Sequence, residues 1–273
     1  MRQPGNPPSG AGRSSVISKG VACILFGALA IIAIVFGPSQ SEIKNDLEFV
    51  QVFETELSSL QSLFTNQTDR FWRNLKNRGL AHFRSLEPRR PLVLLLAAPP
   101  QAHDVVNCLA TKLAEVLDPR NKRNLALVDG IKAKKSPGKD VKKAMDDLLM
   151  KKFEKGHRVA LIQHLELLPF PSPLLFYSYC DDQNAPHKHV AIIFTVHLSK
   201  EPDLSLSAKE AEGAVETYLS DDVWVKEDQD AVAALLSRVA DTVALMNGES
   251  SELEFRVFTV LRRSQGCTLR FRP

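Results

Sequence analysis

The chain has 273 residues, of which 44% are hydrophobic and 25% are charged, so its composition is that of a globular protein with one large or two small cores. Its formal net charge of +3 is too small to indicate a nucleic-acid-binding protein. Residues 1–19 are rich in Pro, Gly and Ser and contain no acidic residue, so we expect them to form a disordered tail.

Residues 20–37 form an uncharged, apolar segment whose length is near the lower limit for a transmembrane helix. A cleaved signal peptide is the alternative, but the Phe-Gly-Pro sequence at residues 36–38 is a poor cleavage site. Basic residues precede the segment and acidic residues follow it closely. The positive-inside rule therefore places the tail in the cytosol or nucleoplasm and the chain after Pro38 in a lumen or outside the cell. This predicts a single-pass type II membrane protein.

Two further features fit a luminal location. Asn66 begins an Asn-Gln-Thr glycosylation sequon, which is used only on the luminal side. Cys23 lies within the predicted span, which leaves Cys108, Cys180 and Cys267 in an oxidising compartment. Three thiols allow one disulfide and one unpaired cysteine.

After the span, helical spacing predicts a stem over residues 38–63, followed by a luminal domain over residues 64–273. Within this domain, segments of strand and helix character alternate, which predicts an α/β fold with a mostly parallel, doubly wound sheet. A last extended segment is expected at Glu254–Val260. The predicted strands are Leu92–Ala97, Asn124–Val128, Arg158–Gln163 and Val190–His197, and the predicted helices are Ala102–Val116, Asp140–Lys155, Leu206–Leu219 and Asp228–Met246.

The first strand and its following turn resemble those of an ATPase without its phosphate site. The strand is bounded by prolines, and the turn at residues 97–101 reads Ala-Ala-Pro-Pro-Gln, with no glycine or lysine to wrap a phosphate. The strand that would carry Mg²⁺-binding acids ends in Gln163 and His164, which are poor ligands for Mg²⁺. We therefore expect no cofactor, no metal and no catalytic residues in this chain. A luminal α/β hydrolase is the enzymatic alternative, but no nucleophile elbow is present.

Two charged residues stand out as candidates for function. Glu166 follows the third strand and is expected to brace the neighbouring loop. Arg238 lies beside an apolar stripe of the last predicted helix. It can pair with a local acid such as Glu212 or Asp241, or it can reach the phosphate of a neighbouring subunit, as arginine fingers do in trans.

Several segments occur in the same order as in the torsin-interacting proteins, which comprise lamina-associated polypeptide 1 of the inner nuclear membrane and its ER-wide paralogue. The chain is similar to this family from Phe64 to Arg238 and in its single-span topology. The segments are Phe64-Thr65-Asn66-Gln67, Arg70-Phe71-Trp72, Leu92–Ala98, Cys108-Leu109-Ala110, Leu165-Glu166-x-x-Pro169, Phe176-Tyr177-x-Tyr179-Cys180-Asp181 and Leu236-Ser237-Arg238.

The resemblance implies a degenerate AAA+-like luminal domain that binds the ATP-bound form of torsin, a AAA+ ATPase of the ER lumen, in a hetero-oligomer. It implies a non-enzymatic activator that supplies Arg238 as an arginine finger, with Glu166 at the partner interface or in a structural role. It also implies a location in the ER membrane or nuclear envelope. A passive luminal tether is the alternative to an activator.

The resemblance further implies a Cys180–Cys267 disulfide, which leaves Cys108 as the buried unpaired thiol. The chain departs from the family after Arg238, because it continues for 35 residues and Cys267 is not close to its end in the same way.

Overall fold

The computed structural model describes residues 40–85, 87–202 and 207–249. Within these ranges no helix has both the length and the apolar character needed to cross a membrane. The predicted tail at residues 1–19, the predicted span at 20–37 and the extended segment Glu254–Val260 lie outside the described residues, and so does Cys267.

The domain is built on a five-stranded sheet in the order β2-β3-β4-β1-β5, in which every neighbouring pair is parallel. This confirms the predicted α/β class and parallel sheet. All seven residues of β1 are buried, as its unbroken apolar sequence predicts for a central strand. The strands are β1 (Leu92–Ala98), β2 (Ala126–Asp129), β3 (Val159–Gln163), β4 (Ala191–His197) and β5 (Val243–Leu245).

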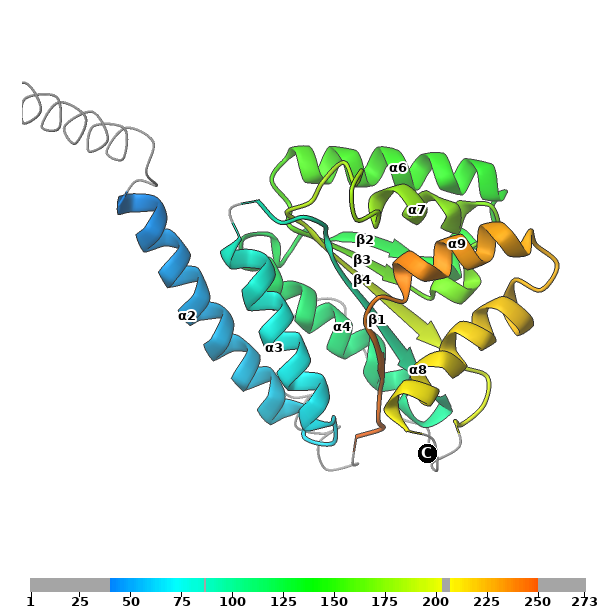
Figure 1. Ribbon diagram of the computed structural model, residues 1–273, viewed down its shortest axis with the longest axis horizontal. Coiled ribbons are helices and arrows are strands. Elements are labelled where there is room, and N and C mark those ends of the chain that lie inside the picture. The colour runs from blue at the N-terminus through cyan, green and yellow to red at the C-terminus, as the bar shows by residue number, and fades with distance from the viewer. Residues whose placement is uncertain (1–39, 86, 203–206, 250–273) are drawn as a thin grey trace, which may run out of the picture. The chain divides into compact units, whose positions relative to one another are not determined.

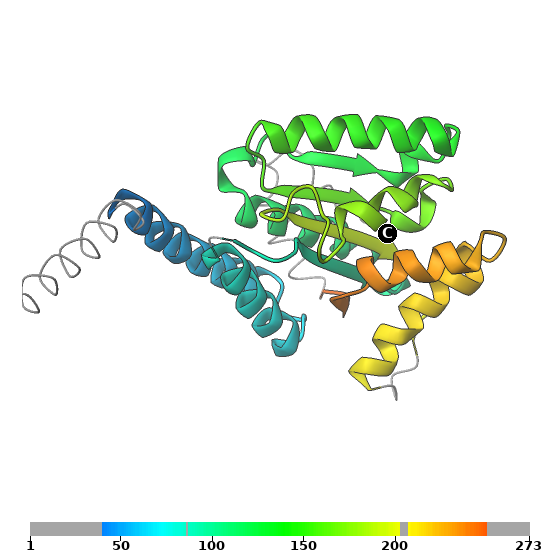
Figure 2. The same ribbon diagram turned by 45° about the horizontal axis from the view of Figure 1, so that its top comes forward.

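Helices cover both faces of the sheet, so each face has its own core. Successive residues of β1 alternate between these cores: Val93 and Leu95 face one cluster, whereas Leu94 and Leu96 face the other. Figure 1 shows α6, α7 and α9 on one side and α3 and α4 on the other, and Figure 2 shows the same layers after a turn of 45°. The main helices are α2 (Gln40–Leu63), α3 (Asp69–Arg84), α4 (His103–Leu117), α5 (Gly130–Ala133), α6 (Gly138–Glu154), α7 (Phe176–Tyr179), α8 (Ala208–Thr217) and α9 (Gln229–Val239).

Short helical turns make several of the connections between these elements. The 3-10 turns are η1 (Pro100–Ala102), η2 (Pro119–Asn121), η3 (Leu165–Leu167) and η4 (Ser172–Leu175), and a π-helical segment η5 (Tyr218–Val223) follows α8.

Side-chain caps mark where the helices α3 and α9 begin. The Thr68 hydroxyl accepts the backbone N–H of Phe71 at the start of α3, and the Asp228 carboxylate accepts the N–H groups of Asp230 and Ala231 at the start of α9. Such caps pair N–H groups that have no partner within the helix.

The last predicted helix is shorter than expected, and this prediction, Asp228–Met246, was wrong at its C-terminal end. α9 ends at Val239, and residues 243–245 form β5 along the open edge of β1. Leu95 N–H donates to the Thr242 carbonyl, and Met246 N–H donates to the Ala97 carbonyl, each at 2.8 Å. The spacing of Val243 and Met246 also fits a helix, but the unpaired backbone groups of β1 favour a strand.

The domain begins earlier than the predicted boundary at residue 64. Phe53, Leu57 and Leu60 in the second half of α2 are at most 4% exposed, and they lie in the same apolar cluster as the buried residues of α3 and α4. The compact unit that contains the sheet starts at Phe49. These residues therefore belong to the core and not to a stem.

The implied disulfide Cys180–Cys267 is not formed, because Cys180 is a free, buried cysteine. Burial raises the pKa of its thiol well above the usual range, which makes it a poor nucleophile. Cys108, which we expected to be the unpaired thiol, is disulfide-bonded instead. Cys180 is the only other cysteine within the described ranges.

Candidate functional site

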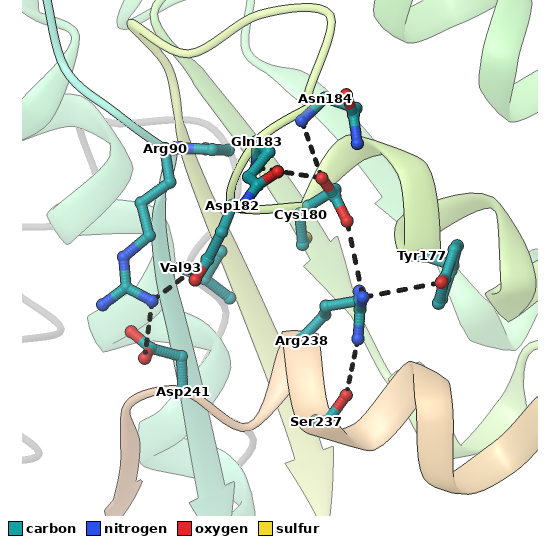
Figure 3. A pocket seen from close by; sticks show the side chains of 12 residues that line it. Arg90, Val93, Tyr177, Cys180, Asp182, Gln183, Asn184, Ser237, Arg238 and Asp241 are labelled. Atoms are coloured by element: carbon teal, nitrogen blue, oxygen red, sulfur yellow. Dashed lines mark hydrogen bonds and ion pairs between the residues drawn. The ribbon is translucent and has the colours of Figure 1, made fainter.

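Arg238 lies in the last turn of α9, where its side chain is held by residues that follow η4 in the sequence (Figure 3). The guanidinium carbon is 4.3 Å from the centre of the Tyr177 ring, an arrangement that attracts a cation to the ring face. One terminal nitrogen donates to the Ser237 hydroxyl at 2.8 Å, and the other lies 3.4 Å from a carboxylate oxygen of Asp181.

The turn after α7 orients the carboxylate of Asp181. Its Oδ1 accepts the backbone N–H groups of Gln183 and Asn184 at 2.9 and 2.7 Å, which leaves Oδ2 directed toward Arg238. These N–H groups, followed by the charge of Arg238, lower the pKa of the Asp181 carboxyl. Asp181 therefore stays ionised at neutral pH and holds the guanidinium in place.

Arg238 remains available for a further contact. Its side chain is 29% exposed, and its one contact with Asp181 at 3.4 Å is not the two-bond geometry of a strong arginine–carboxylate pair. The structural alternative that paired it with Asp241 is wrong, because that carboxylate contacts Arg78 at 2.8 Å and Arg90 at 3.0 Å instead.

A cavity of about 400 Å³ lies beside the guanidinium. It is formed by the start of β1, the segment from Tyr177 to Asn184 and the end of α9. Two arginines, Arg90 and Arg238, line it together with acidic side chains.

The turn after β1 lacks the glycines and the lysine of a phosphate-binding loop. Two prolines, Pro99 and Pro100, have no N–H group to donate. The N–H of Gln101 is bound by the Glu201 carboxylate at 3.1 Å, and the N–H of Ala102 by the Pro99 carbonyl at 2.8 Å. Of the four residues 99–102, two therefore have no N–H, and the N–H groups of the other two are already bound within the chain.

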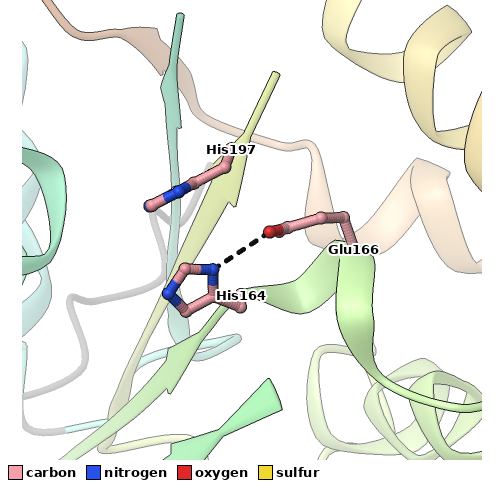
Figure 4. A group of neighbouring side chains, drawn as sticks. All are labelled: His164, Glu166 and His197. Atoms are coloured by element: carbon pink, nitrogen blue, oxygen red, sulfur yellow. Dashed lines mark hydrogen bonds and ion pairs between the residues drawn. The ribbon is translucent and has the colours of Figure 1, made fainter. Parts of the chain in front are cut away.

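A group of polar side chains lies at the same edge, where β3 and β4 end (Figure 4). The rings of His164 and His197 have their centres 4.1 Å apart, and His103 from the start of α4 stacks on His197 at 4.2 Å. The Asn107 amide contacts the Nε2 atoms of His164 and His197 at 3.1 and 3.3 Å. Burial, with the neighbouring imidazoles of His164 and His103, lowers the pKa of His197 to about 3.

Glu166 lies inside this group and not on an exposed surface. Its Oε1 accepts a hydrogen bond from His164 Nδ1 at 3.1 Å. His164 has a φ of 58°, and this left-handed residue between β3 and η3 places both side chains on one side of the turn. The backbone of Gly130 packs against the His164 carbonyl so closely that a side chain there would overlap with it.

Sequence reasoning missed this histidine group and the partners of Arg238. One available signal was the position of His164 and His197 at the ends of two predicted strands, because carboxyl ends of neighbouring parallel strands meet at one edge. Asp181 is 57 residues from Arg238, and no local pattern links them.

Asn66 is exposed, as a glycosylation site must be, but its side chain is not free. The side-chain amide donates to the Gly248 carbonyl, and the backbone N–H donates to Glu249 at 3.0 Å. Gln67 is part of the same contact, because it donates to the Asn247 carbonyl at 2.8 Å. The sequon therefore joins the start of α3 to the segment after β5.

The chain is similar to proteins of one family. The family model described as lamina-associated polypeptide 1, AAA+ activator domain, matches residues 36–253. Torsin-1A-interacting protein 1 of Rattus norvegicus is 31% identical over 212 residues, which are 74% of this chain and 36% of that protein. The Mus musculus protein of the same name is 33% identical over 172 residues, 62% of this chain and 29% of that protein. The chain thus spans about a third of the length of these relatives.

Proposed function

This chain belongs to the family of the lamina-associated polypeptide 1 AAA+ activator domain, and from that premise we propose that it activates a torsin ATPase without hydrolysing ATP itself. Curated relatives carry the name Torsin-1A-interacting protein 1, which supports torsin as the partner. The domain would bind the ATP-bound form of torsin in a hetero-oligomer and complete its active site.

Arg238 is the residue that performs this role in our proposal. A planar, permanently charged guanidinium stabilises the negative charge that develops on the phosphate being transferred. The observation that carries the assignment is its partial exposure at the end of α9, with one long ion pair to Asp181 and a stacking contact with Tyr177. On binding, the guanidinium would exchange Asp181 for the phosphate while the Tyr177 ring keeps its stem in position.

The occupied turn after β1 supports a chain without a nucleotide site of its own. Gln101 N–H is bound to Glu201, the two prolines donate nothing, and Gln163 and His164 stand where Mg²⁺-binding acids are expected. The N–H groups of Gln101 and Ala102 would not be free to bind ATP. All the hydrolysis in the mixed assembly would then take place on torsin.

Phosphate release from ATP-loaded torsin tests the proposal. Adding the full chain should accelerate release, and Arg238→Ala should abolish the acceleration, because arginines supplied in trans contribute about 10³–10⁵-fold in the best-studied hydrolases. Arg238→Lys should also fail to restore most of it, since an ammonium lacks the planar fork. Arg73→Ala, which removes an exposed arginine of α3, is the matched control and should stimulate normally.

Binding of the same variants to ATP-loaded torsin separates an activator from a tether. Arg238→Ala should retain most of the binding while it loses stimulation. If the wild-type chain bound torsin without changing phosphate release, the passive tether would replace our proposal. If Arg238→Ala stimulated like the wild type, the arginine-finger assignment would fail.

The membrane topology is part of the same proposal. The uncharged segment at residues 20–37 would span the membrane of the ER or the nuclear envelope, with everything after Pro38 in the lumen, and Asn66 would carry a glycan. A shift in electrophoretic mobility after glycosidase treatment, absent from Asn66→Gln, would support this topology. Full protection of the tail and exposure of the domain to protease in sealed microsomes would contradict it.

A further inference from the structure

Three potential metal ligands converge where β3 and β4 end, at the opposite end of β1 from the Arg238 cavity. His164 follows β3, Glu166 lies in η3, and His197 is the last residue of β4. Each offers one ligand atom, and these atoms all lie within 4.8 Å of one another. Figure 4 shows the side chains of His164 and Glu166 directed toward each other, with the ring of His197 beside them.

Glu166 is only partly satisfied within the protein. Its side chain is 6% exposed, its Oε1 accepts from His164, and its Oε2 is buried with no hydrogen-bond partner. No lysine or arginine among the described residues forms an ion pair with it. An ionised carboxylate with an unpaired, desolvated oxygen is unfavourable, and a bound cation would compensate for it.

We propose that His164, Glu166 and His197 bind a zinc ion, with water as the fourth ligand. Tetrahedral zinc has bonds of about 2.0–2.1 Å to nitrogen and oxygen, which places neighbouring ligand atoms roughly 3.3 Å apart. His164 Nδ1 and Glu166 Oε1 are already 3.1 Å apart. The remaining ligand, His197, has to move closer, because the three ligand atoms lie within 4.8 Å of one another and not yet at the separation of a tetrahedral site.

The hydrogen bonds of His164 are compatible with a metal at Nδ1. Because Glu166 is an acceptor, Nδ1 carries the single hydrogen of the neutral imidazole in the metal-free protein, and zinc binding at Nδ1 requires this hydrogen to move to Nε2 by exchange with solvent, with no net release of a proton. The imidazole then carries its hydrogen on Nε2, to which the Asn107 amide must present its oxygen. The Thr195 hydroxyl, now donating to Asn107 Oδ1 at 2.9 Å, can also accept, so it serves either amide orientation.

Two residues act as positioning residues for these ligands. Asn107 contacts Nε2 of both imidazoles, and His103 stacks on His197 while its own Nε2 contacts the Leu198 carbonyl at 3.0 Å. Contacts of this kind fix the orientation of histidine ligands in metal sites. The left-handed backbone of His164 turns the chain directly after β3 and so determines where η3, which carries Glu166, begins.

The donor set selects the type of ion. Two imidazole nitrogens and one carboxylate oxygen suit zinc, which binds two histidines and a glutamate in known sites. Magnesium prefers oxygen ligands in octahedral geometry and would gain little from two imidazoles. The ion would occupy the edge of the sheet at which α/β proteins bind their ligands, which here has no phosphate loop.

Titration of the full chain with zinc chloride after EDTA treatment tests this inference, with bound metal counted by elemental analysis. The wild type should bind one equivalent, and Glu166→Gln, which has nearly the same volume, should weaken binding by at least about tenfold. His197→Ala should do the same. The matched control is His189→Ala, an exposed histidine in the loop before β4, which should bind zinc like the wild type. Magnesium chloride in excess should not displace the zinc.

Cobalt substitution gives a readout that does not depend on whether the variants fold. Cobalt in the wild-type chain should show the strong visible absorption of a tetrahedral site, and zinc should remove it by competition. Absence of stoichiometric zinc in the wild type would overturn the inference. Unchanged zinc affinity in both Glu166→Gln and His197→Ala would overturn it as well. Neither result would affect the arginine-finger proposal, which concerns the other end of the sheet.

Discussion

The guanidinium of Arg238 stacks on the ring of Tyr177, with its central carbon 4.3 Å from the ring centre, and Tyr177 is itself 43% exposed. A cation from α9 and an aromatic from α7 therefore form one surface feature. Exposed aromatic residues beside arginines are common at the centre of protein interfaces. The exposed residue Tyr177 therefore both holds Arg238 in position and belongs to the surface that a partner would contact.

Tyr177→Ala should lower the stimulation of torsin by about two- to fivefold, because a cation–π contact at an exposed site is worth about 0.5–1 kcal/mol. Tyr177→Phe should retain most of the stimulation, since the ring remains and the hydroxyl contact with Arg238 is long at 3.5 Å. Phosphate release with ATP-loaded torsin measures both. Equal loss in the two variants would show that the hydroxyl, and not the ring, positions Arg238.

The stability of the metal-free protein should fall as the pH decreases from about 6.5 toward 3. An imidazole titrates near pH 6.5 in the unfolded chain, whereas the pKa of His197 in the folded chain is about 3. Between these values the unfolded chain binds a proton that the folded chain does not, so acid favours unfolding. Urea unfolding at a series of pH values in EDTA measures this dependence.

The variant His197→Phe should show a shallower pH dependence of stability, because a phenyl ring cannot be protonated. His189→Phe, which replaces an exposed histidine outside the group around His197, is the comparison and should keep the wild-type dependence. If the free energy of unfolding of His197→Phe depended on pH as steeply as that of the wild type, a group other than His197 would cause the dependence.

Gly130→Ala should destabilise the domain by about 1–3 kcal/mol, because the new methyl group would overlap with the His164 carbonyl, a backbone atom that cannot move independently. Gly213→Ala is the matched comparison, since nothing lies within 4 Å of the position where its methyl group would go. Within α8 that change should stabilise by about 0.5–1 kcal/mol. Urea unfolding of both variants measures whether the free energy of unfolding falls in Gly130→Ala and rises in Gly213→Ala.

Phe53→Ala should destabilise the domain by about 3–5 kcal/mol, because the ring is 0% exposed in the core beneath α3 and α4. Val52→Ala on the same helix should change stability by less than about 0.5 kcal/mol, since Val52 is 40% exposed. Thermal or urea unfolding distinguishes them. If Phe53→Ala changed the free energy of unfolding only slightly, this part of α2 would be a stem, as the sequence predicts, and not part of the core.

The features of this protein that depend on local pattern could be predicted from the order of its residues. The run of Leu and Val at residues 92–98 predicted a buried central strand, and alternating segments predicted the parallel sheet. The turn after β1 lacks glycine and lysine, which is visible without coordinates. Arg238 was singled out from its place beside the apolar stripe of α9. These features are encoded by residues that are close together in the chain, so periodicity and composition report them.

The features that depend on partners far apart in the chain became visible only in the folded domain. Val243 and Met246 fit either a helix or a strand, and the open edge of β1 selected the strand. Asp181 holds Arg238 across 57 residues, and the group formed by His164, Glu166 and His197 exists only because β3 and β4 lie side by side. Such contacts are stabilised by burial and by charge interactions between segments that are far apart in the chain. The local spacing of residues does not show which of these segments come into contact.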